Sequence, residues 1–556
     1  MKLSELNLQY VNEGFDSDGL LNKFEPKPTP DYNFAYDVVD AIAAIEPNKK
    51  ALVWCDDNDN ERTFTFAELS KLSSQAANMF TDKGVKKGDM VLCVLKRHWQ
   101  IWITILALEK IGAILIPATN QLMPKDFVYR FKSGDVKFTV ATSDGDVLAH
   151  IDESEKEYTG LLGKFSAKGS RDGWVDFDNE FVKYPDTFKR VDTKVEEPLL
   201  AFFSSGTTGY PKMVVHDHTY SLAHLISAKH WHCVTENSLH LTISESGWGK
   251  FFWGKIYGEW LMGAAIFAYD FEKFDPNKVL SKIEKYKITS LCCPPTMYRF
   301  FIKGGIEDHD LSSLEYATTA GEALNPEVFN RFKESTGLTI MEGFGQTETV
   351  LSIGNLRGST PRAGSMGKPV PLYTVDIVNE ECESLPVGET GEIVIRYDEH
   401  TNQAGLFREY YGNREATATT KCKGVYHTGD TAYKDEDGYY WYVGRTDDVI
   451  KSSGYRIGPF EIESVLMEHP SVLEVAVTAV PDPVRGQIVK ATIVLTKEYK
   501  DKGTDELKKE LQNYVKTNTA PYKYPRVIDF IDELPKTISG KIRRVEIRER
   551  DNQKAQ

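Results

Sequence analysis

Apolar residues recur at helical and strand-like spacings along the first third of the chain. In the segment 66–80 they stand three or four positions apart, after a Thr-Phe-Ala-Glu capping pattern and before Gly84, which predicts a helix. A short apolar run, 90–95, follows, then a helical stretch, 99–111, and a second short run, 113–117. Strand, helix and strand in this order indicate βαβ units and a largely parallel sheet.

The alternation of strands and helices continues to about residue 360, and then the pattern changes. Beyond it the predicted strands are short and bounded by turns, which is typical of an antiparallel or barrel-like unit. After Arg445 roughly 110 residues remain, a usual size for a small domain. The sequence therefore predicts an α/β protein, α+β overall, with a large N-terminal domain, 1–445, and a small α+β C-terminal domain, 446–556. Further predicted strands are 138–141, 199–203, 264–269, 290–293, 316–320, 375–378, 391–396, 439–443, 473–480, 489–495 and 527–531, and further helices are 277–286, 459–469 and 505–517.

The composition is that of an ordinary soluble globular protein. The chain of 556 residues is 41% hydrophobic and 27% charged, and it exceeds the roughly 250–300 residues at which a single core stops growing. Its most apolar stretch, 99–117, is interrupted by charges and too short to span a bilayer. The first residues carry no arginine and no apolar block, and seven cysteines lack CxxC spacing. We therefore expect a cytoplasmic protein without integral membrane association.

The net charge of −15 opposes binding to nucleic-acid phosphates and anionic membranes, so no nucleic acid is expected as a partner. The segment 536–550 is an exception, because it is rich in lysine and arginine. It is interpreted either as a solvated helix face or as a surface that approaches a nucleotide.

The stretch FFSSGTTGYPK, 202–212, combines small hydroxyl side chains, glycines and one lysine behind a predicted buried strand. Consecutive amides in a glycine-permitted turn bind anions, and hydroxyls and a lysine add donors and charge. A flexible connection is the alternative. The lysine follows a proline and no GK[ST] follows, so the stretch is not the GxxxxGK[ST] loop. We predict a polyphosphate-binding loop formed by Ser204, Ser205, Gly206, Thr207, Thr208 and Lys212.

Five segments in chain order resemble the motifs of the adenylate-forming superfamily, which includes acyl-CoA synthetases, firefly luciferase and peptide-synthetase adenylation domains. Met213 and the segments 469–491 and 520–526 resemble the medium-chain acyl-CoA synthetases in particular. The five segments are SSGTTGYPK at 204–212, GFGQTET at 343–349, YHTGD at 426–430, GRTDDVIKSSGYRIGPFEIE at 444–463 and PKTISGK at 535–541.

The resemblance implies an ATP-dependent acyl-CoA synthetase with two half-reactions. A carboxylic acid and ATP first give an acyl-adenylate and pyrophosphate, and the thiol of coenzyme A then displaces AMP. The implied catalytic residues are Lys541 and Thr347 at the α-phosphate, and Glu348, which would hold Mg²⁺ because a hard cation prefers carboxylate oxygen. The other nucleotide-binding residues it implies are Gly321, Glu322, Ala323, Phe344, Gly345, Asp430 at the ribose hydroxyls, Arg445 and Arg456.

The second half-reaction requires the phosphates to leave and a thiol to enter. Members of the superfamily swing the small domain for this step, and Asp447 matches the hinge. Ser453, Gly454 and Tyr455 would then line the thiol tunnel. The resemblance also implies that Arg485, Tyr524 and Arg526 meet the nucleotide of coenzyme A.

The acyl pocket is expected where several of these motifs meet. Acetate-specific relatives carry a tryptophan just before the QTET segment, and Phe344-Gly345 stands there in this chain, which suggests a chamber for a medium-chain, branched or aromatic acid. Lys250 is either a polar determinant of this pocket or an exposed residue. The pocket residues are Trp248, Gly249, Lys250, Cys293, Pro294, Ala320, Gly321, Phe344 and Gly345.

Other functions are also compatible with parts of the sequence. Within the superfamily these are a short-chain CoA ligase and a ligase that delivers the adenylate to a carrier protein. Outside it they are a nucleotide sensor without chemistry and a kinase-like NTPase. The histidines between His216 and His232 suggest zinc, but their spacing fits no established ligand pattern, and helix packing explains them better.

Overall fold

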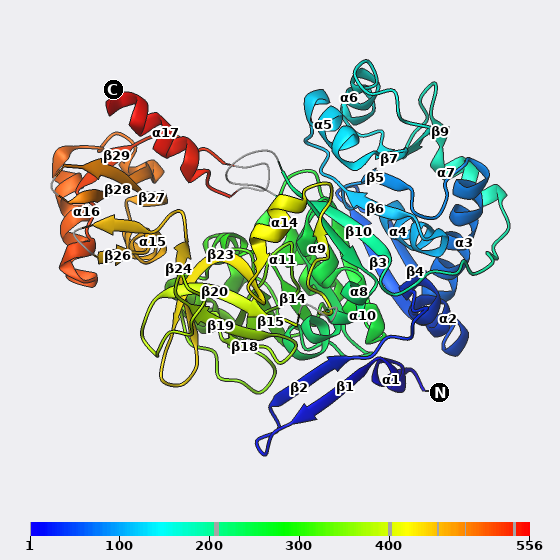
Figure 1. Cartoon of the computed structure of the whole chain (residues 1–556), viewed down its shortest axis with the longest axis horizontal. Coiled ribbons are helices and arrows are strands. Elements are labelled where there is room, and N and C mark those ends of the chain that lie inside the picture. Colours follow the sequence, from blue (N-terminus) through cyan, green and yellow to red (C-terminus); the bar gives the residue numbers. More distant parts are fainter. Residues whose placement is uncertain are drawn as a thin grey trace.

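The computed structural model describes residues 2–204, 211–398, 403–452, 455–483, 485–536 and 541–555. Figure 1 shows a large N-terminal body and, at one side, a smaller group of elements from α15 to α17. The chain passes between them after β24 (Tyr440–Arg445). The boundary predicted after Arg445 falls in this connection and stays a prediction.

An eight-stranded sheet forms one part of the large body. Its order is β21-β11-β10-β6-β5-β7-β8-β9, and only β11 and β21 at one edge run antiparallel to their neighbours. The βαβ units predicted from the sequence are confirmed, since α4 (Gln100–Ile111) connects the parallel strands β5 and β6 and ends at the left-handed Gly112. The strands are β5 (Met90–Val94), β6 (Ile114–Pro117), β7 (Phe138–Thr142), β8 (Gly163–Ala167), β9 (Val175–Asp176), β10 (Pro198–Phe203), β11 (Met213–Asp217) and β21 (Glu409–Tyr410).

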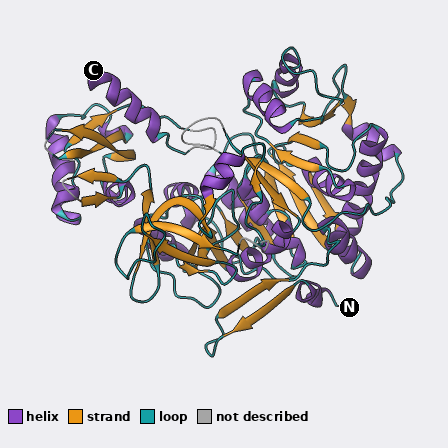
Figure 2. Ribbon diagram, viewed as in Figure 1, coloured by secondary structure: helices purple, strands orange, loops and turns teal. Residues whose placement is uncertain are grey.

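A nine-stranded sheet forms the second part, in the order β18-β17-β16-β15-β14-β12-β13-β3-β4. Its six central strands are parallel, so their carboxyl ends meet along one edge. Helices lie around both large sheets (Figure 2). The strands are β3 (Lys50–Asp56), β4 (Glu61–Thr65), β12 (Leu239–Thr242), β13 (Ala265–Asp270), β14 (Ser290–Cys292), β15 (Tyr316–Thr319), β16 (Ile340–Phe344), β17 (Ile353–Gly354) and β18 (Lys368–Pro369).

The helices of the large body confirm the helical patterns of the sequence. The helix α3 (Phe66–Asp82) begins with the predicted capping box, in which Thr65 and Glu68 exchange hydrogen bonds with each other's backbone amides. The other helices used below are α9 (Gly249–Gly254), α11 (Pro276–Tyr286), α12 (Pro295–Lys303) and α13 (Pro326–Thr336).

The antiparallel unit predicted after residue 360 is also confirmed. Five strands pair in the order β19-β20-β23-β22, with β24 on β23, and every pairing is antiparallel. They are β19 (Thr374–Val378), β20 (Gly391–Arg396), β22 (Lys421–Cys422), β23 (Val425–Lys434) and β24.

The C-terminal elements form an α+β domain with its own apolar core, which includes Ile450, Leu466, Val477 and Leu511. Its sheet has the order β26-β25-β28-β27, with β29 parallel to β28. The elements are β25 (Ile450–Ser452), β26 (Tyr455–Ile457), α15 (Pro459–Glu468), β27 (Val472–Asp482), β28 (Gly486–Leu495), α16 (Asp505–Asn518), β29 (Val527–Phe530) and α17 (Arg544–Ala555).

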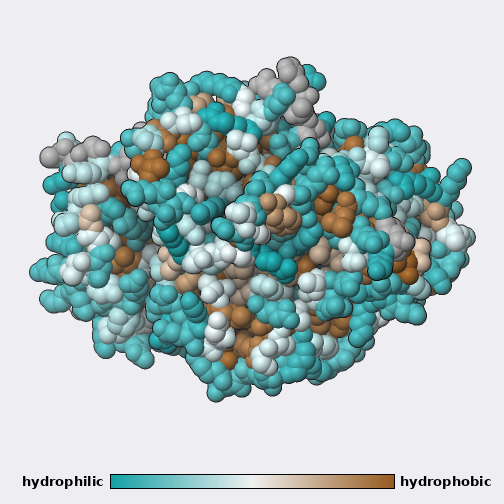
Figure 3. All heavy atoms as spheres, turned by 90° about the horizontal axis from the view of Figure 1, so that it is seen from below, coloured by the Kyte–Doolittle hydropathy of each residue, from teal (hydrophilic) through white to brown (hydrophobic). Residues whose placement is uncertain are grey.

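Figure 3 shows one face of the molecule, where hydrophobic residues form scattered patches among mostly hydrophilic ones. Among the described residues, no helix combines the length and the apolarity that a bilayer crossing requires. An N-terminal hairpin, β1 (Val11–Phe15) and β2 (Leu21–Pro26), projects from the large body and was not predicted from the sequence.

Candidate active site

The phosphate loop predicted from the sequence connects two antiparallel strands. Phe203 at the end of β10 pairs with Met213 at the start of β11. The amide of Ser204 donates to the carbonyl of Lys212 at 2.8 Å, and the amide of Lys212 donates to the Ser204 hydroxyl at 3.2 Å. These bonds close the base of the loop. Ser205, Gly206, Thr207 and Thr208 lie outside the described residues.

Lys212, Tyr410 and Glu348 form a chain beside this loop. The Lys212 ammonium lies 4.7 Å from the centre of the Tyr410 ring, and the Tyr410 hydroxyl donates to the Glu348 carboxylate at 2.9 Å. Burial raises the pKa of Glu348, while the bond from Tyr410 and the charges of Arg445 and Lys212 act to lower it. Lys212 and Arg445 therefore lie near Glu348, the predicted Mg²⁺ ligand. Tyr410 was missed because it lies outside every motif.

Thr347 is held by a histidine from the opposite sheet. The Nε2 atom of His216, on β11, lies 2.7 Å from the Thr347 carbonyl oxygen. A carbonyl only accepts, so Nε2 carries the proton and donates. Burial lowers the pKa of His216 to about 3, which keeps the imidazole neutral. His216 therefore orients the GFGQTET segment through this hydrogen bond.

Asp430 lies at the centre of a hydrogen-bonded group on β23 and β24. Its carboxylate accepts from Gln346 Nε2 at 2.5 Å and from the Tyr442 hydroxyl at 3.1 Å, and Arg445, its cross-strand partner, lies at 3.5 Å. Burial raises the pKa of Asp430, and the first opposing influence is the charge of Arg445. The structure thus brings the predicted pair Asp430 and Arg445 together. Gln346 and Tyr442 are additional members that the sequence analysis missed, although Gln346 stands inside a quoted motif.

Lys541 approaches this group from the C-terminal domain. Its charge is among the influences that lower the pKa of Asp430, so the two side chains lie within electrostatic reach. In Figure 1 the helix that follows it, α17, begins on the side that faces the large domain. Two interdomain contacts accompany this orientation: Asn325 donates to the Ser464 carbonyl at 3.2 Å, and Arg299 contacts the Met467 sulfur at 3.4 Å.

Two arginines and one lysine of the basic segment 536–550 pair with carboxylates of their own domain. Arg544 pairs with Glu463 at 2.7 Å, and Arg548 pairs with Asp448. Lys536 likewise pairs with Glu474 at 2.7 Å. These cations neutralise carboxylates of their own domain, and the two arginines anchor α17. The charge of Lys541 instead acts on Asp430.

The predicted coenzyme A residues lie on the C-terminal domain. Ser453 and Gly454 fall outside the described residues. Tyr455 is half exposed and stacks on Tyr522, with ring centres 4.1 Å apart. The structure brings Tyr524 and Arg526 together, because the Arg526 guanidinium donates to the Tyr524 hydroxyl at 2.8 Å. The backbone amide of Arg485 donates to the Asp482 carboxylate at 2.8 Å. Arg456 lies on β26, where its backbone pairs with that of Lys451 on β25. The carboxylate of Asp447, the predicted hinge, lies 3.7 Å from the Arg445 guanidinium.

The predicted acyl-pocket residues come from α9 and from the carboxyl ends of β14, β15 and β16. Trp248 directly precedes α9 and Gly249 begins it, Cys293 is buried after β14, and Pro294 precedes α12. The Lys250 ammonium donates to the Ala320 carbonyl at 2.7 Å, so Lys250 is a partly buried residue of this region and the exposed alternative is wrong.

Two glycines of the predicted acyl pocket, Gly321 and Gly345, differ in backbone conformation and in the space around their Cα atoms. Gly321 has φ +103, a conformation that favours glycine, and begins the predicted nucleotide-binding segment 321–323 with Glu322 and Ala323. A Cβ at Gly345 would lie 2.3 Å from the Trp253 ring. The space that this glycine leaves is therefore filled by Trp253, so Gly345 by itself does not make the chamber larger. Phe344 is partly buried beside it.

One buried cluster has the composition of a metal site. Ligand atoms of His232, His240 and Glu259 lie within 4.8 Å of one another. Both nitrogens of His240 are already paired with the hydroxyls of Ser290 and Thr242, at 3.0 and 2.8 Å. The two imidazoles are stacked, with planes 25° apart, so their in-plane lone pairs do not converge on one ion. The cluster is a buried polar network, in which His232 also pairs with Glu259 at 2.8 Å.

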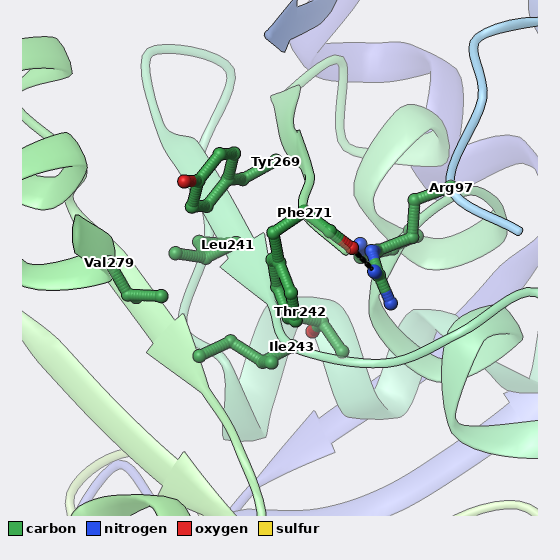
Figure 4. A pocket seen from close by; sticks show the side chains of 8 residues that line it. Arg97, Leu241, Thr242, Ile243, Tyr269, Phe271 and Val279 are labelled. Carbon is green, nitrogen blue, oxygen red and sulfur yellow. Dashed lines mark hydrogen bonds between the residues drawn. The ribbon is translucent and has the colours of Figure 1, made fainter. Parts of the chain in front are cut away.

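A separate small pocket lies between β12, β13 and α11 (Figure 4). Its lining is mainly apolar and contains none of the predicted site residues. The residues that line it are Arg97, Leu241, Thr242, Ile243, Lys255, Tyr269, Phe271 and Val279.

Sequence profiles of known families match both parts of the chain. The profile of the AMP-binding enzyme family matches residues 39–411, and that of the AMP-binding enzyme C-terminal domain matches residues 461–541. The chain belongs to the AMP-binding enzyme family.

Relatives of this AMP-binding enzyme are similar over nearly their whole length. Acyl-coenzyme A synthetase ACSM3, mitochondrial, of Rattus norvegicus is 42% identical over 532 residues, which cover 94% of this chain and 91% of the relative. Acyl-coenzyme A synthetase ACSM5, mitochondrial, of the same organism is 41% identical over 534 residues, which cover 94% and 92%. These similarities confirm the resemblance inferred from the motifs.

Solved structures confirm the fold of this AMP-binding enzyme. The crystal structure of the anthranilate CoA ligase AuaEII in complex with anthranoyl-AMP aligns with a TM-score of 0.85 and 28% identity over 95% of this chain and 98% of that chain. The acyl-CoA synthetase of Brucella canis aligns with a TM-score of 0.71 and 32% identity over 95% and 96%. The two-domain α/β architecture is therefore shared with known CoA ligases.

Proposed function

We propose that this AMP-binding enzyme is an ATP-dependent acyl-CoA synthetase that acts on a carboxylic acid larger than acetate. In the first half-reaction a carboxylate oxygen attacks the α-phosphorus of ATP, and pyrophosphate leaves. In the second, the sulfur of coenzyme A attacks the acyl carbon, and AMP leaves. The relatives named acyl-coenzyme A synthetases and the related ligase that was solved with anthranoyl-AMP support this proposal.

The observation that carries the proposal is the convergence of charged groups from both domains on Asp430. Arg445 approaches it across the strand pair, and Lys541 acts on it from the small domain. A carboxylate with paired acceptor sites suits the two ribose hydroxyls. A cation next to it would stabilise the negative charge that develops at the α-phosphate. The orientation of the domains thus favours the adenylate-forming step, with Thr347 and Lys212 as further phosphate contacts.

The residues present fit a bound Mg²⁺. Glu348 offers carboxylate oxygen, which this hard cation prefers, and Tyr410 occupies only one of about four acceptor sites on that carboxylate. When bound, Mg²⁺ would neutralise charge on the triphosphate of ATP. The carboxylate must be ionised to hold the ion.

The thioester-forming step is assigned to a second orientation of the C-terminal domain, with Asp447 as the hinge. Rotation there would exchange the Lys541 segment for the one that carries Ser453, Gly454 and Tyr455. Arg485, Tyr524 and Arg526 would meet the nucleotide of coenzyme A. The adjacency of Tyr524 and Arg526 supports a shared role in binding it.

The decisive experiment separates the two half-reactions. In a Lys541→Ala variant, ATP-dependent pyrophosphate release should fall by several orders of magnitude, while acyl-adenylate supplied from outside should still react with coenzyme A. The matched control is Lys536→Ala, which removes a lysine of the same segment that pairs with Glu474. If both half-reactions fail equally in folded Lys541→Ala protein, the assignment is wrong.

Product analysis tests the remaining alternatives. AMP and pyrophosphate without a CoA thioester would indicate delivery to a carrier protein, and activity with acetate alone would indicate a short-chain ligase. Formation of ADP would indicate a kinase-like enzyme, and no product would indicate a sensor. A cytoplasmic location stays a prediction, and the two relatives named above are mitochondrial. Imaging of the tagged chain in its own cells tests it.

A further inference from the structure

Lys250, in the expected acyl pocket, is a cation that no carboxylate among the described residues pairs with. Its ammonium gives one hydrogen bond, to the Ala320 carbonyl at 2.7 Å. In the described part of the chain it has no carboxylate partner and no second hydrogen bond, although an ammonium carries three donors. Lys96 and Lys164 of this domain pair with carboxylates. Lys421 resembles Lys250 in having carbonyl partners, but it donates to two of them. Lys250 is therefore a candidate for a ligand contact.

The position of Lys250 is that of a substrate contact. It stands in the first turn of α9 and reaches over the ends of β14 and β15, two adjacent parallel strands. In open α/β sheets, ligands bind outside the carboxyl ends of such strands. Burial raises the pKa of the Cys293 thiol, and the leading opposing influence is the charge of Lys250, which places the ammonium near that pocket residue.

The chemistry of the pocket then depends on what covers this ammonium. An alkyl chain that packed against it would remove water from the two remaining donors and offer nothing in return, which is unfavourable. An oxygen acceptor would replace that water, and a carboxylate would also supply the missing counter-charge.

We propose that Lys250 is a specificity-determining residue that selects carboxylic acids with a second hydrogen-bond acceptor on the acyl chain, most strongly a second carboxylate. This inference rests on the proposed function, because it assigns a substrate class to the same pocket. The ammonium pairs with the remote acceptor while the reacting carboxylate lies toward the nucleotide.

A simpler role is possible for the same contact, and it makes a different prediction. If Lys250 only holds the Ala320 carbonyl, its loss would disturb the turn at Gly321 and the predicted nucleotide-binding segment 321–323. The KM for ATP would then rise to the same extent with every acid. A specificity role instead changes the ratio of kcat/KM between acids and leaves the KM for ATP nearly unchanged.

The test compares acids of equal length with and without the acceptor. Pyrophosphate release is measured for hexanoate against hexanedioate and for benzoate against 4-carboxybenzoate, with wild type, Lys250→Met and Lys250→Arg. We expect wild type to prefer the dicarboxylic member. Lys250→Met should lower kcat/KM for that member by about 10- to 100-fold relative to its partner, and Lys250→Arg should keep the direction of the preference. Lys273→Met, which removes an exposed lysine, is the matched control.

The outcomes separate this inference from the proposed function. If wild type activates alkyl acids with no preference for the acceptor, or if Lys250→Met changes both members of each pair equally, the role of Lys250 is overturned while the acyl-CoA synthetase stands. If wild type releases no pyrophosphate with any of the acids and yields no CoA thioester, the proposed function fails as well.

Discussion

The hydroxyl of Tyr410 donates a 2.9 Å hydrogen bond to the carboxylate of Glu348. This bond favours the ionised carboxylate against the effect of burial, which raises the Glu348 pKa. In Tyr410→Phe the pKa should rise further, so less of the carboxylate is ionised at a given pH. The apparent Kd for Mg²⁺ should increase about 3- to 10-fold, and the acidic limb of the pH–rate profile should move to higher pH.

Pyrophosphate release as a function of Mg²⁺ concentration, measured at pH 6 and pH 8, checks this prediction. The difference between wild type and Tyr410→Phe should be larger at the lower pH. Tyr411→Phe is the control, because the neighbouring tyrosine is 39% exposed. An identical Mg²⁺ dependence of wild type and Tyr410→Phe at both values would contradict a metal-binding role for Glu348.

The pair of Arg544 and Glu463 should stabilise the C-terminal domain. Arg544 donates to both oxygens of Glu463 at 2.7 Å, and one of these oxygens also accepts from the Val477 amide. Arg544→Met leaves a buried carboxylate without its counter-charge, which should destabilise the domain by about 3 kcal/mol. Urea denaturation followed by tryptophan-independent probes such as far-UV circular dichroism measures the change. Arg543→Met, at an exposed neighbour, should be nearly neutral, and equal midpoints for the two variants would refute the prediction.

Glu342 should make the large domain less stable as the pH rises. Burial raises its pKa from 4.5 to about 8, against a single hydrogen bond from the Leu324 amide. Its contribution to stability is therefore fully present below pH 4.5 and is lost as the pH rises through 8, by at most about 1.4 kcal/mol per pH unit. Glu342→Gln should flatten this dependence and raise stability at pH 8. Urea unfolding at pH 5, 6.5 and 8 measures the free energy of unfolding of wild type and Glu342→Gln, and Glu315→Gln, at an exposed position, is the control. If the free energy of unfolding depends on pH in the same way in Glu342→Gln and wild type, the role of Glu342 is excluded.

Trp253 should limit the length of the acyl group. Its ring fills the space beside Gly345, where a Cβ would lie 2.3 Å away. Trp253→Phe should open room for about one or two methylenes, each worth about 0.8 kcal/mol of apolar burial, and should shift the optimum toward longer acids. The ratio of kcat/KM across a series of straight-chain acids measures the shift. Trp174→Phe, at a buried tryptophan next to the edge strand β9, is the control, and an unchanged optimum would place Trp253 outside the pocket.

The order of elements and the nucleotide motifs could be predicted from the sequence. Apolar spacing, capping residues and glycine act within one or two turns of chain, so the helices α3 and α4 were predicted within a few residues of their observed bounds. The same holds for seven strands of the two large sheets, β5, β6, β7, β10, β13, β14 and β15, whereas strands such as β3, β8, β11 and β12 were not predicted. The motifs named Asp430, Arg445 and Lys541, and the structure brings these three groups within electrostatic reach of one another.

The contacts that hold those residues could not be predicted in the same way. Gln346 reaches Asp430 from 84 positions away, and Tyr410 reaches Glu348 from 62. Lys250 meets Ala320 across 70 positions, and Arg544 meets Glu463 across 81. Local patterns carry no information about which distant side chains share a site, because that depends on how sheets and domains pack. The sequence alone determined the family and many of the local elements, because these depend on residues that are close together in the chain. The tertiary structure decided which distant charges are paired and which groups are buried, because these depend on how the sheets and domains pack.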